Sequence, residues 1–233
     1  MKLVIAFACA LSAHAQVTAT LTRLPSGWEE IRIRNTAAID VVAFAVYARQ
    51  TPRSPDSART PYVAYVDSLE PQGKTLQANE EQVVIARSLI PPGAGSVEEP
   101  IVTAGILEDG ATVGDRTLLT RLLSRRCNLL LAVETTLDIL LGAGSRNVPR
   151  GQLIGQFQDL ANGLNRWYVP AEQHAGRNLY QSMVGKLMNL PKEPPGSAFP
   201  PSDFVTREAA ELSRLRSSLL DAQPSLAEAA WLR

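Results

Sequence analysis

The sequence predicts a segregated α+β protein: an N-terminal antiparallel β-sandwich of about seven strands, followed by a C-terminal four-helix region. Three observations predict it. Short alternating segments rich in β-branched residues, separated by turn residues, fill residues 16–114. Apolar residues recur at helical spacing throughout residues 115–233. The two patterns meet at 105–119, GILEDGATVGDRTLL, where a hairpin signal is followed directly by a helix-start signal.

Residues 1–15 have the pattern of a secretory signal peptide. Lys2 is followed by a short apolar run, and Ala13-His14-Ala15 forms an A-x-A cleavage site. We expect cleavage after Ala15, which leaves a periplasmic or secreted chain from Gln16 to Arg233. The apolar run is too short to span a bilayer. We expect no later membrane span, because Arg125 and Arg126 interrupt the longest apolar stretch.

The first half is predicted to contain short strands connected by turns. In the second of them, Ile31 and Ile33 should point inward and Arg32 and Arg34 outward. Thr75–Ala86 is predicted to form one bent strand or two short ones. The other predicted strands are Val17–Arg23, Trp28–Asn35, Ile39–Ala48, Tyr62–Val66, Val97–Leu107 and Ala111–Val113. Gln50–Pro61 contains three prolines and no periodicity, so we expect a mobile surface loop there.

The junction of the two halves contains two turn signals. Asp109-Gly110 predicts a two-residue type I′ hairpin turn, which requires positive φ values that glycine adopts freely and aspartate tolerates. Gly114 relaxes the backbone, and Asp115 stands where an N-cap should accept backbone N–H groups. Because almost no linker remains, we expect the halves to be coupled rigidly.

Four amphipathic helices are expected in the second half. The first should run from Asp115 to about Leu141 and end at Gly142–Gly144, and Asn147 should cap the second helix, with Pro149 in its first turn. The expected buried stripe of the first helix is Leu118, Leu119, Leu122, Leu123, Leu129, Leu130, Val133, Leu137 and Leu140. The expected stripe of the second helix is Leu153, Phe157, Leu160, Leu164 and Trp167. That of the third helix is Leu179, Tyr180, Met183, Val184, Leu187 and Met188, and that of the fourth helix is Val205, Ala209, Leu212, Leu215 and Leu219. Pro191–Pro201 is expected to be a stiff linker, and 226–232 one last short helix.

Charge and cysteine content exclude several classes of protein. Residues 16–114 carry 8 basic and 12 acidic side chains, and residues 115–233 carry 14 basic and 11 acidic side chains. The small basic excess of the second half is too weak for nucleic-acid binding. Cys127 is the one cysteine left after cleavage, so no intramolecular disulfide can form. We expect Cys127 to be half-buried beside the leucine stripe, rather than a redox thiol or a link between two copies.

The residues Ile33-x-Asn35, then Ile39 and Phe44, then Leu69-Glu70-Pro71-x-Gly73, resemble small immunoglobulin-like or fibronectin-like domains of bacterial extracytoplasmic proteins. LEDGATVGD at 107–115 also resembles secreted bacterial proteins in which such a sandwich precedes a helical tail. The resemblance covers residues 16–115 at most, and the chain lacks the cysteine pair of antibody domains. It implies an immunoglobulin-like sandwich over residues 16–114 and an extracytoplasmic compartment, and little about function.

The sequence contains no recognisable catalytic or metal-binding motif. His174 is the one histidine of the mature chain, so His-rich metal sites are excluded. It should be an exposed surface residue sharing a helix face with Asn178 and Gln181. The adjacent pairs Glu29-Glu30, Glu80-Glu81 and Glu98-Glu99 should point to opposite faces of their strands. Carboxylates from distant segments could still form a glycosidase or calcium site. We expect no cofactor.

Two clusters are candidates for binding. Arg121, Arg125 and Arg126 form a basic cluster, for which a solvated face or intramolecular pairing with the acidic first half is favoured over an anion site. Trp167-Tyr168 is the densest aromatic pair of the second half. Core packing is the favoured interpretation, and a partner-binding site is the alternative, because aromatic residues are enriched in both settings.

Two functional hypotheses remain. The first is a non-enzymatic extracytoplasmic interaction or assembly protein, with a β-sandwich supporting a helical surface for a protein or cell-envelope partner, or for a second copy. The second is a hydrolase of envelope polymers that uses carboxylates from separate segments. A polar cleft with two facing carboxylates would favour the hydrolase, whereas an apolar surface would favour binding.

Overall fold

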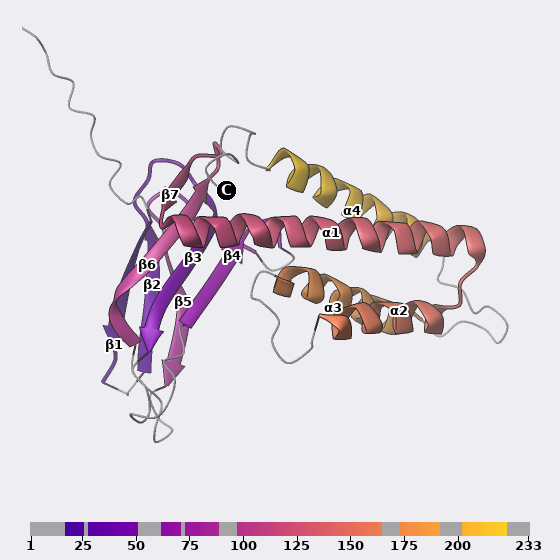
Figure 1. Ribbon diagram of the computed structural model, residues 1–233, viewed down its shortest axis with the longest axis horizontal. Helices are drawn as coiled ribbons and strands as arrows, with labels where there is room; N and C mark the ends of the chain where they lie inside the picture. Colours follow the sequence, from indigo (N-terminus) through magenta and orange to yellow (C-terminus); the bar gives the residue numbers. More distant parts are fainter. Residues whose placement is uncertain are drawn as a thin grey trace, which may run out of the picture. The chain divides into compact units, whose positions relative to one another are not determined.

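The computed structural model describes residues 17–25, 28–50, 62–70, 73–88, 97–164, 173–191 and 202–222. The described residues form seven antiparallel strands in two sheets, followed by four helices (Figure 1), which confirms the α+β prediction. They divide into two compact units: one within Met1–Tyr65 and Thr75–Leu119, the other within Val66–Lys74 and Thr120–Arg233. The predicted signal peptide, Trp167, Tyr168, most of the Gln50–Pro61 loop and of the 191–201 linker, and the short helix at 226–232 lie outside the described residues.

The strands of the first unit pair in two sheets. The three-stranded sheet has the order β1 (Val17–Arg23), β2 (Trp28–Asn35), β5 (Glu81–Ser88). The four-stranded sheet has the order β4 (Tyr62–Asp67), β3 (Val41–Gln50), β6 (Val97–Leu107), β7 (Thr112–Gly114). The sheets meet where β1 approaches β6, and there the Thr103 hydroxyl donates to the Val17 carbonyl oxygen at 2.8 Å.

Strand alternation places the predicted side chains inside. Ile31 and Ile33 of β2 are buried, whereas Arg34 is exposed, as expected. Glu29 shares the inward face and is also buried, because the Arg23 guanidinium of the neighbouring strand pairs with it at 3.1 Å. Its neighbour Glu30 is only half-buried and pairs with Arg32 instead, so these two carboxylates do not converge.

Two predicted strand boundaries change for a local reason. The Asn35 amide donates to the carbonyl oxygens of Ile39 and Leu76, which holds residues 36–40 in a bend and delays the start of β3 to Val41. In the 75–86 segment, Leu76 forms an isolated bridge with Val41, and a turn with Asn79 at φ 62° separates it from β5. This segment therefore contains two short pieces.

The β6–β7 hairpin differs from the predicted type I′ turn. The Leu107 N–H donates to the Ala111 carbonyl oxygen at 2.8 Å, and the Gly110 N–H donates to the Leu107 oxygen at 3.0 Å. Gly110 has φ 84°, but Asp109 is not in the positive-φ region. The connection is therefore a three-residue loop with glycine in the left-handed position. The Asp109 carboxylate accepts the Ala111 N–H at 3.0 Å and stabilises this loop.

Gly114 and Asp115 make the transition from strand to helix. Gly114 has φ 91°, and a Cβ there would lie against the Thr103 carbonyl oxygen. Both the positive φ and the lack of space for a side chain therefore require glycine at this position. The same oxygen accepts the Asp115 N–H at 2.9 Å. The Asp115 carboxylate accepts the Leu118 N–H at 2.9 Å, which confirms the predicted N-cap.

The first helix, α1 (Arg116–Arg146), continues five residues beyond its predicted end, through Gly142 and Gly144. Ser145 and Arg146 donate side-chain hydrogen bonds to the Gly142 carbonyl oxygen, and Ala143 is buried in the core. The helix ends at Asn147, with φ 52° and the Val148 N–H donating to the Ala143 oxygen, a Schellman motif. Asn147 therefore terminates α1, and the prediction that it caps the next helix is wrong; Pro149 occupies that N-cap.

The remaining helices are α2 (Arg150–Gly163), α3 (His174–Met188) and α4 (Ser202–Asp221). Gly176 lets α3 approach α1 closely, because a Cβ there would lie 3.0 Å from the Ala132 Cβ. Met188, which the spacing places in the stripe of α3, is 60% exposed. In α4 the predicted stripe is shifted: Phe204 is buried, whereas Val205, Ala209 and Leu215 are only partly buried. One core is enclosed by the described stripe residues from Leu129 on, and its buried members include Leu129, Val133, Leu140, Leu153, Phe157, Leu179, Met183, Leu187, Leu212 and Leu219.

Arg150 ties the beginning of α2 to the end of α3. Its guanidinium donates to the carbonyl oxygens of Met188, Leu190 and Pro191 at 2.9, 3.1 and 3.2 Å. The last carbonyl groups of a helix have no partner within the helix. Arg150 therefore supplies a donor to the Met188 carbonyl oxygen, the last of α3, and further donors to the two carbonyl groups just beyond the helix.

Two arginines of α1 hold the segment Val66–Lys74 within the helical unit. The Arg126 guanidinium pairs with the Asp67 carboxylate at 2.6 and 3.1 Å, and both side chains are almost fully buried. One residue earlier, Arg125 pairs through two nitrogens with Glu70. Leu69, between the two acids, packs against the helical core. This outcome confirms the predicted intramolecular pairing for these two arginines.

Among the described residues, α1 is the one helix that is long and apolar enough to cross a membrane by length and composition. Of its most apolar 18-residue window, 33% is buried inside the protein. The core helix of a soluble protein passes the same test of length and composition. The expectation that the chain has no membrane span therefore stays a prediction.

Replacing Gly114 with alanine should destabilise the protein more than replacing Gly110. Both residues have positive φ, but an added Cβ meets backbone atoms only at Gly114 and meets nothing within 4 Å at Gly110. Urea unfolding should show a loss of about 1–2 kcal/mol for Gly110→Ala, the cost of left-handed backbone, and a clearly larger loss for Gly114→Ala. Equal losses would contradict this account of the junction.

Asp67→Asn should reduce the free energy of unfolding by about 3–5 kcal/mol, because it leaves the Arg126 charge buried without its counter-ion. The matched control is Glu134→Gln, which removes the exposed pair between Glu134 of α1 and Arg216 of α4. That loss should be at most about 1 kcal/mol. Both losses are measured by urea denaturation, and a loss for Asp67→Asn no larger than the control would refute the assigned role.

Candidate functional site

The candidate site is a groove of about 820 Å³ in the helical unit, bounded by α1 and α2 and floored in part by α3. We name it the α1–α2 groove. Its lining consists of Thr135, Ile139 and Arg146 of α1, Val148 of the connection, Gln152, Gln156, Asp159, Leu160 and Gly163 of α2 with the following Leu164, and Tyr180 of α3. Its volume is in the range of ligand-binding pockets.

The α1 wall depends on the extension of this helix past its glycines. Thr135, Ile139 and Arg146 lie along one face, and Arg146 stands at the last helical residue. A Cβ on Gly142 would lie 2.6 Å from Nη2 of Arg146. Glycine thus leaves the space that the guanidinium occupies, and the Arg146 Nε–H donates to the Gly142 carbonyl oxygen at 3.1 Å. This wall therefore ends in a positive charge.

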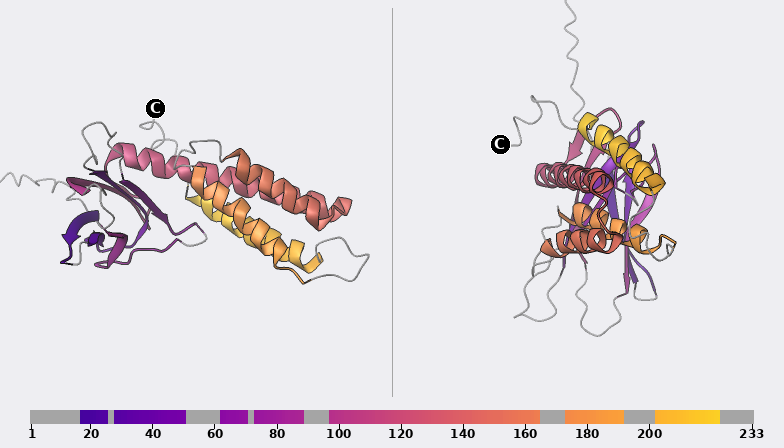
Figure 2. Two further views of the ribbon diagram at one scale, coloured as in Figure 1. Left: turned by 90° about the horizontal axis from the view of Figure 1, so that it is seen from below. Right: turned by 90° about the vertical axis from the view of Figure 1, so that its right-hand side faces the viewer.

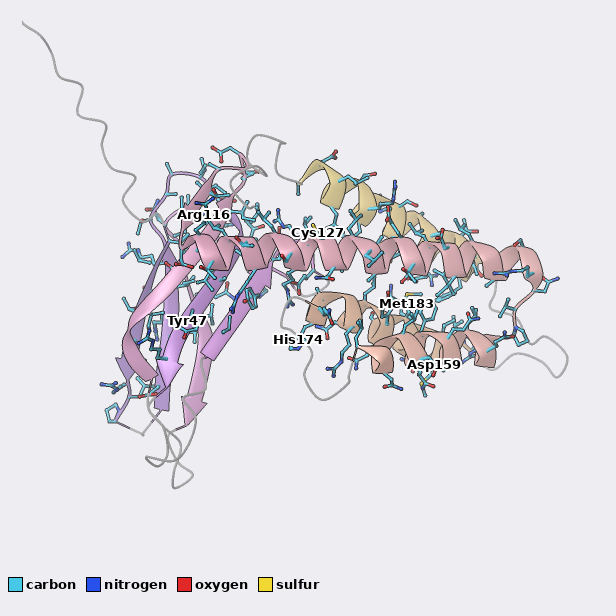
Figure 3. The ribbon with its side chains drawn as sticks, in the orientation of Figure 1. Tyr47, Arg116, Cys127, Asp159, His174 and Met183 are labelled. Carbon is cyan, nitrogen blue, oxygen red and sulfur yellow. The ribbon has the colours of Figure 1, made fainter. Side chains whose placement is uncertain are left out.

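The α2 wall is polar. Gln152, Gln156 and Asp159 follow one another at spacings of four and three residues, which places them on one face of the helix. All three are exposed, and α2 runs back beside α1 after the short connection (Figures 1 and 2). Asp159, labelled in Figure 3, is thus displaced along the groove from Arg146.

Tyr180 is a buried side chain of the groove. It is 6% exposed, and its ring stacks on that of Phe157 with centroids 6.4 Å apart. Burial raises the pKa of the Tyr180 phenol above its ordinary value, and a hydrogen bond with Thr135 acts in the opposite direction. The Thr135 hydroxyl in turn donates to the Leu131 carbonyl oxygen at 2.8 Å. Tyr180 is therefore a neutral, hydrogen-bonded part of the floor.

The arrangement is suited to binding. Ile139, Val148, Leu160 and Leu164 are half-buried, so apolar surface remains to be covered, and polar side chains surround it. Asp159 is the one carboxylate in the lining as described, so no acid–base pair faces the groove there. Across the described ranges, no group of three or more His, Cys, Asp or Glu residues could hold a metal ion.

Of the residues singled out from the sequence, those that the structure describes do not line the groove. His174 is exposed at the beginning of α3 (Figure 3), with Asn178 and Gln181 also exposed, as expected. Arg125 and Arg126 are buried in ion pairs, whereas Arg121 is exposed, so the basic cluster is divided. Trp167 and Tyr168 follow Leu164 in sequence but lie outside the described residues.

Cys127 is exposed, and the prediction of a half-buried residue is wrong. The two buried positions before it on α1 are taken by Arg125 and Arg126, which turn toward Glu70 and Asp67. The next residue along the helix is rotated by about 100° from Arg126. Cys127 therefore does not share their buried face and is exposed.

Sequence reasoning does not find the groove. The polar spacing of Gln152, Gln156 and Asp159 is visible in the sequence, but a stripe of this kind is also typical of a solvated helix face. The further signal is apolar: helical spacing assigns Leu160 and Leu164 to the core, and both are only half-buried. Whether such a residue is fully buried, half-buried or exposed depends on how the three helices pack together, and no local sequence pattern specifies that packing.

Comparisons with protein-family models, with curated proteins and with solved structures give no match to this chain. A function is therefore inferred from the geometry of the described residues.

Proposed function

We propose that this protein is a non-enzymatic binding protein that receives a protein partner in the α1–α2 groove. The observation that carries the proposal is the composition of this groove: half-buried apolar side chains in its lining, with glutamine, aspartate and arginine around them. An apolar centre with a polar rim is the usual anatomy of a protein interface. Covering Ile139, Leu160 and Leu164 would remove apolar surface from water and so favour association.

The hydrolase alternative has less support. Cleavage of a glycosidic bond needs two carboxyl groups that flank the bond. Asp159 stands without a second carboxylate in the described lining of the groove. The adjacent pair Glu29-Glu30 is engaged by Arg23 and Arg32, and Glu81 also pairs with Arg32. The described geometry thus favours binding over acid–base chemistry.

We further propose that the strands of residues 16–114 form an immunoglobulin-like or fibronectin-like sandwich. The strand orders β1-β2-β5 and β4-β3-β6-β7 support this assignment. In a constant-type immunoglobulin domain, strands one, two and five share a sheet, and strands three, six and seven form the other. The fourth strand here pairs beside β3 instead of beside β5, which is a departure from the constant type.

Export is also part of the proposal, because residues 1–15 carry a signal-peptide pattern. The chain expressed in a bacterium should be recovered outside the cytoplasm with Gln16 as its first residue. Intact-mass measurement checks this. A secreted chain that still begins with Met1 would contradict the assigned cleavage site, and a chain retained in the cytoplasm would contradict export.

Filling the groove should abolish partner capture. Gly163 lies at the end of the α2 wall, is exposed and has no described atom within 4 Å of an added Cβ, so Gly163→Trp places a bulky ring at the groove. Gly151, at the other end of α2, is equally open and exposed but does not line the groove. Gly151→Trp is therefore the matched control.

The measurement is affinity capture from native envelope extract with the full chain and quantification by mass spectrometry. A partner that binds through the groove should be recovered equally with wild type and Gly151→Trp, and at least about tenfold less with Gly163→Trp. Capture that is unaffected by Gly163→Trp would refute the groove as the binding site. Hydrolysis of envelope polymers by the wild-type chain would favour the enzymatic alternative.

A further inference from the structure

Both walls of the α1–α2 groove have helical periodicity over the same length. On α1 the lining residues run from Thr135 to Arg146, and on α2 from Gln152 to Gly163, eleven residue steps in each case. At 1.5 Å per residue, each wall is about 16 Å long, which is three helical turns. Rows of side chains at this spacing are the ridges between which a further helix packs.

The interior of the groove can accept apolar side chains. Ile139 of α1 and Leu160 of α2 are half-buried in its lining. The phenol of the buried Tyr180 forms a hydrogen bond with Thr135. A ligand that entered this space would therefore find few unsatisfied polar groups at depth. The apolar stripe of an amphipathic helix, with one residue per turn, meets this requirement over the full length of the groove.

The charges of the groove lie toward opposite ends. Arg146 is next to the connection between α1 and α2, and Asp159 is nine residues into α2, one turn before Gly163. Neither side chain forms an ion pair with another described residue. Since α2 runs back beside α1 (Figure 1), Arg146 and Asp159 stand on residues that are separated along the length of the groove.

We propose that the occupant of the α1–α2 groove is an amphipathic α-helix of about three turns from a partner protein, with an acidic residue that meets Arg146 at one end and a basic residue that meets Asp159 at the other. This proposal rests on the proposed function and specifies its partner. The apolar stripe supplies affinity, and the two end charges supply register and selectivity. In a helix that is acidic at both ends, one acidic residue meets Asp159, and in a helix that is basic at both ends, one basic residue meets Arg146. Each of these is a repulsive contact between like charges.

The test uses three synthetic helical peptides, each with the same leucine stripe over three turns and the same hydrocarbon staple on the polar face. One has a glutamate at one end and a lysine at the other, the second has glutamate at both ends, and the third has lysine at both ends. Fluorescence anisotropy with the full chain at low ionic strength should give a dissociation constant for the mixed peptide roughly fivefold below those of the other two.

Charge reversal of the protein supplies the decisive comparison. Arg146→Glu should transfer the preference to the peptide with two lysines, and Asp159→Lys should transfer it to the peptide with two glutamates. Gly163→Trp should weaken all three complexes, and Gly151→Trp should weaken none. Higher salt should reduce the preference among peptides, because exposed charges are screened.

Equal binding of the three peptides, or a preference that does not follow the charge reversals, would overturn the proposal. Binding of a fluorescent fatty acid that is lost in Gly163→Trp, with no binding of any peptide, would assign the groove to an amphiphile and also overturn it. If partner capture still depends on Gly163 while all peptides fail, the groove binds protein by another mode. The helix proposal then falls, and the proposed function stands.

Discussion

The helical unit depends on the burial of two positive charges on α1. Arg125 and Arg126 follow each other in sequence, and both are removed from water by the fold. A buried guanidinium without a counter-ion is costly, so the arrangement requires Glu70 and Asp67 to accept it in two-pronged pairs. A segment that belongs to the strand-rich half of the sequence is thereby fixed to a helix more than fifty residues later. The pairs determine which segment packs on α1, whatever their net contribution to stability.

The length of α1 links this packing to the proposed function. Gly142 and Gly144 weaken a helix, yet Ala143 is buried in the core and Arg146 folds back over Gly142. The extra turns supply the charged end of the α1–α2 groove. Had the helix stopped at Leu141, the α1 wall would lack Arg146, and the groove would lose its positive charge. A local departure from helix propensity is thus what gives the candidate site its electrostatic character.

Periodicity predicted most of the fold. The alternation around Ile31 and Ile33, the N-cap at Asp115 and the core stripes from α1 to α4 follow directly from spacing and capping chemistry. The errors occur where tertiary contacts override local preference. Packing of Ala143 extends α1 past its glycines, the pairing of Arg126 turns Cys127 outward, and α3 leaves Leu160 half-covered. The groove could not be predicted, because it arises from the relative placement of three helices.

The hydrogen bonds of Arg150 have a consequence for the dynamics of the groove. Terminal turns of helices usually exchange their amide hydrogens fastest, since they open with little loss of structure. Arg150 joins the first turn of α2 to the carbonyl oxygen of Met188, the last residue of α3, and to that of Leu190 just beyond it, so fraying at either end costs these hydrogen bonds. Gln152 of the groove lies two residues on, in the same first turn. A ligand that reaches this end of the groove therefore meets a helix turn that is tied to a second helix.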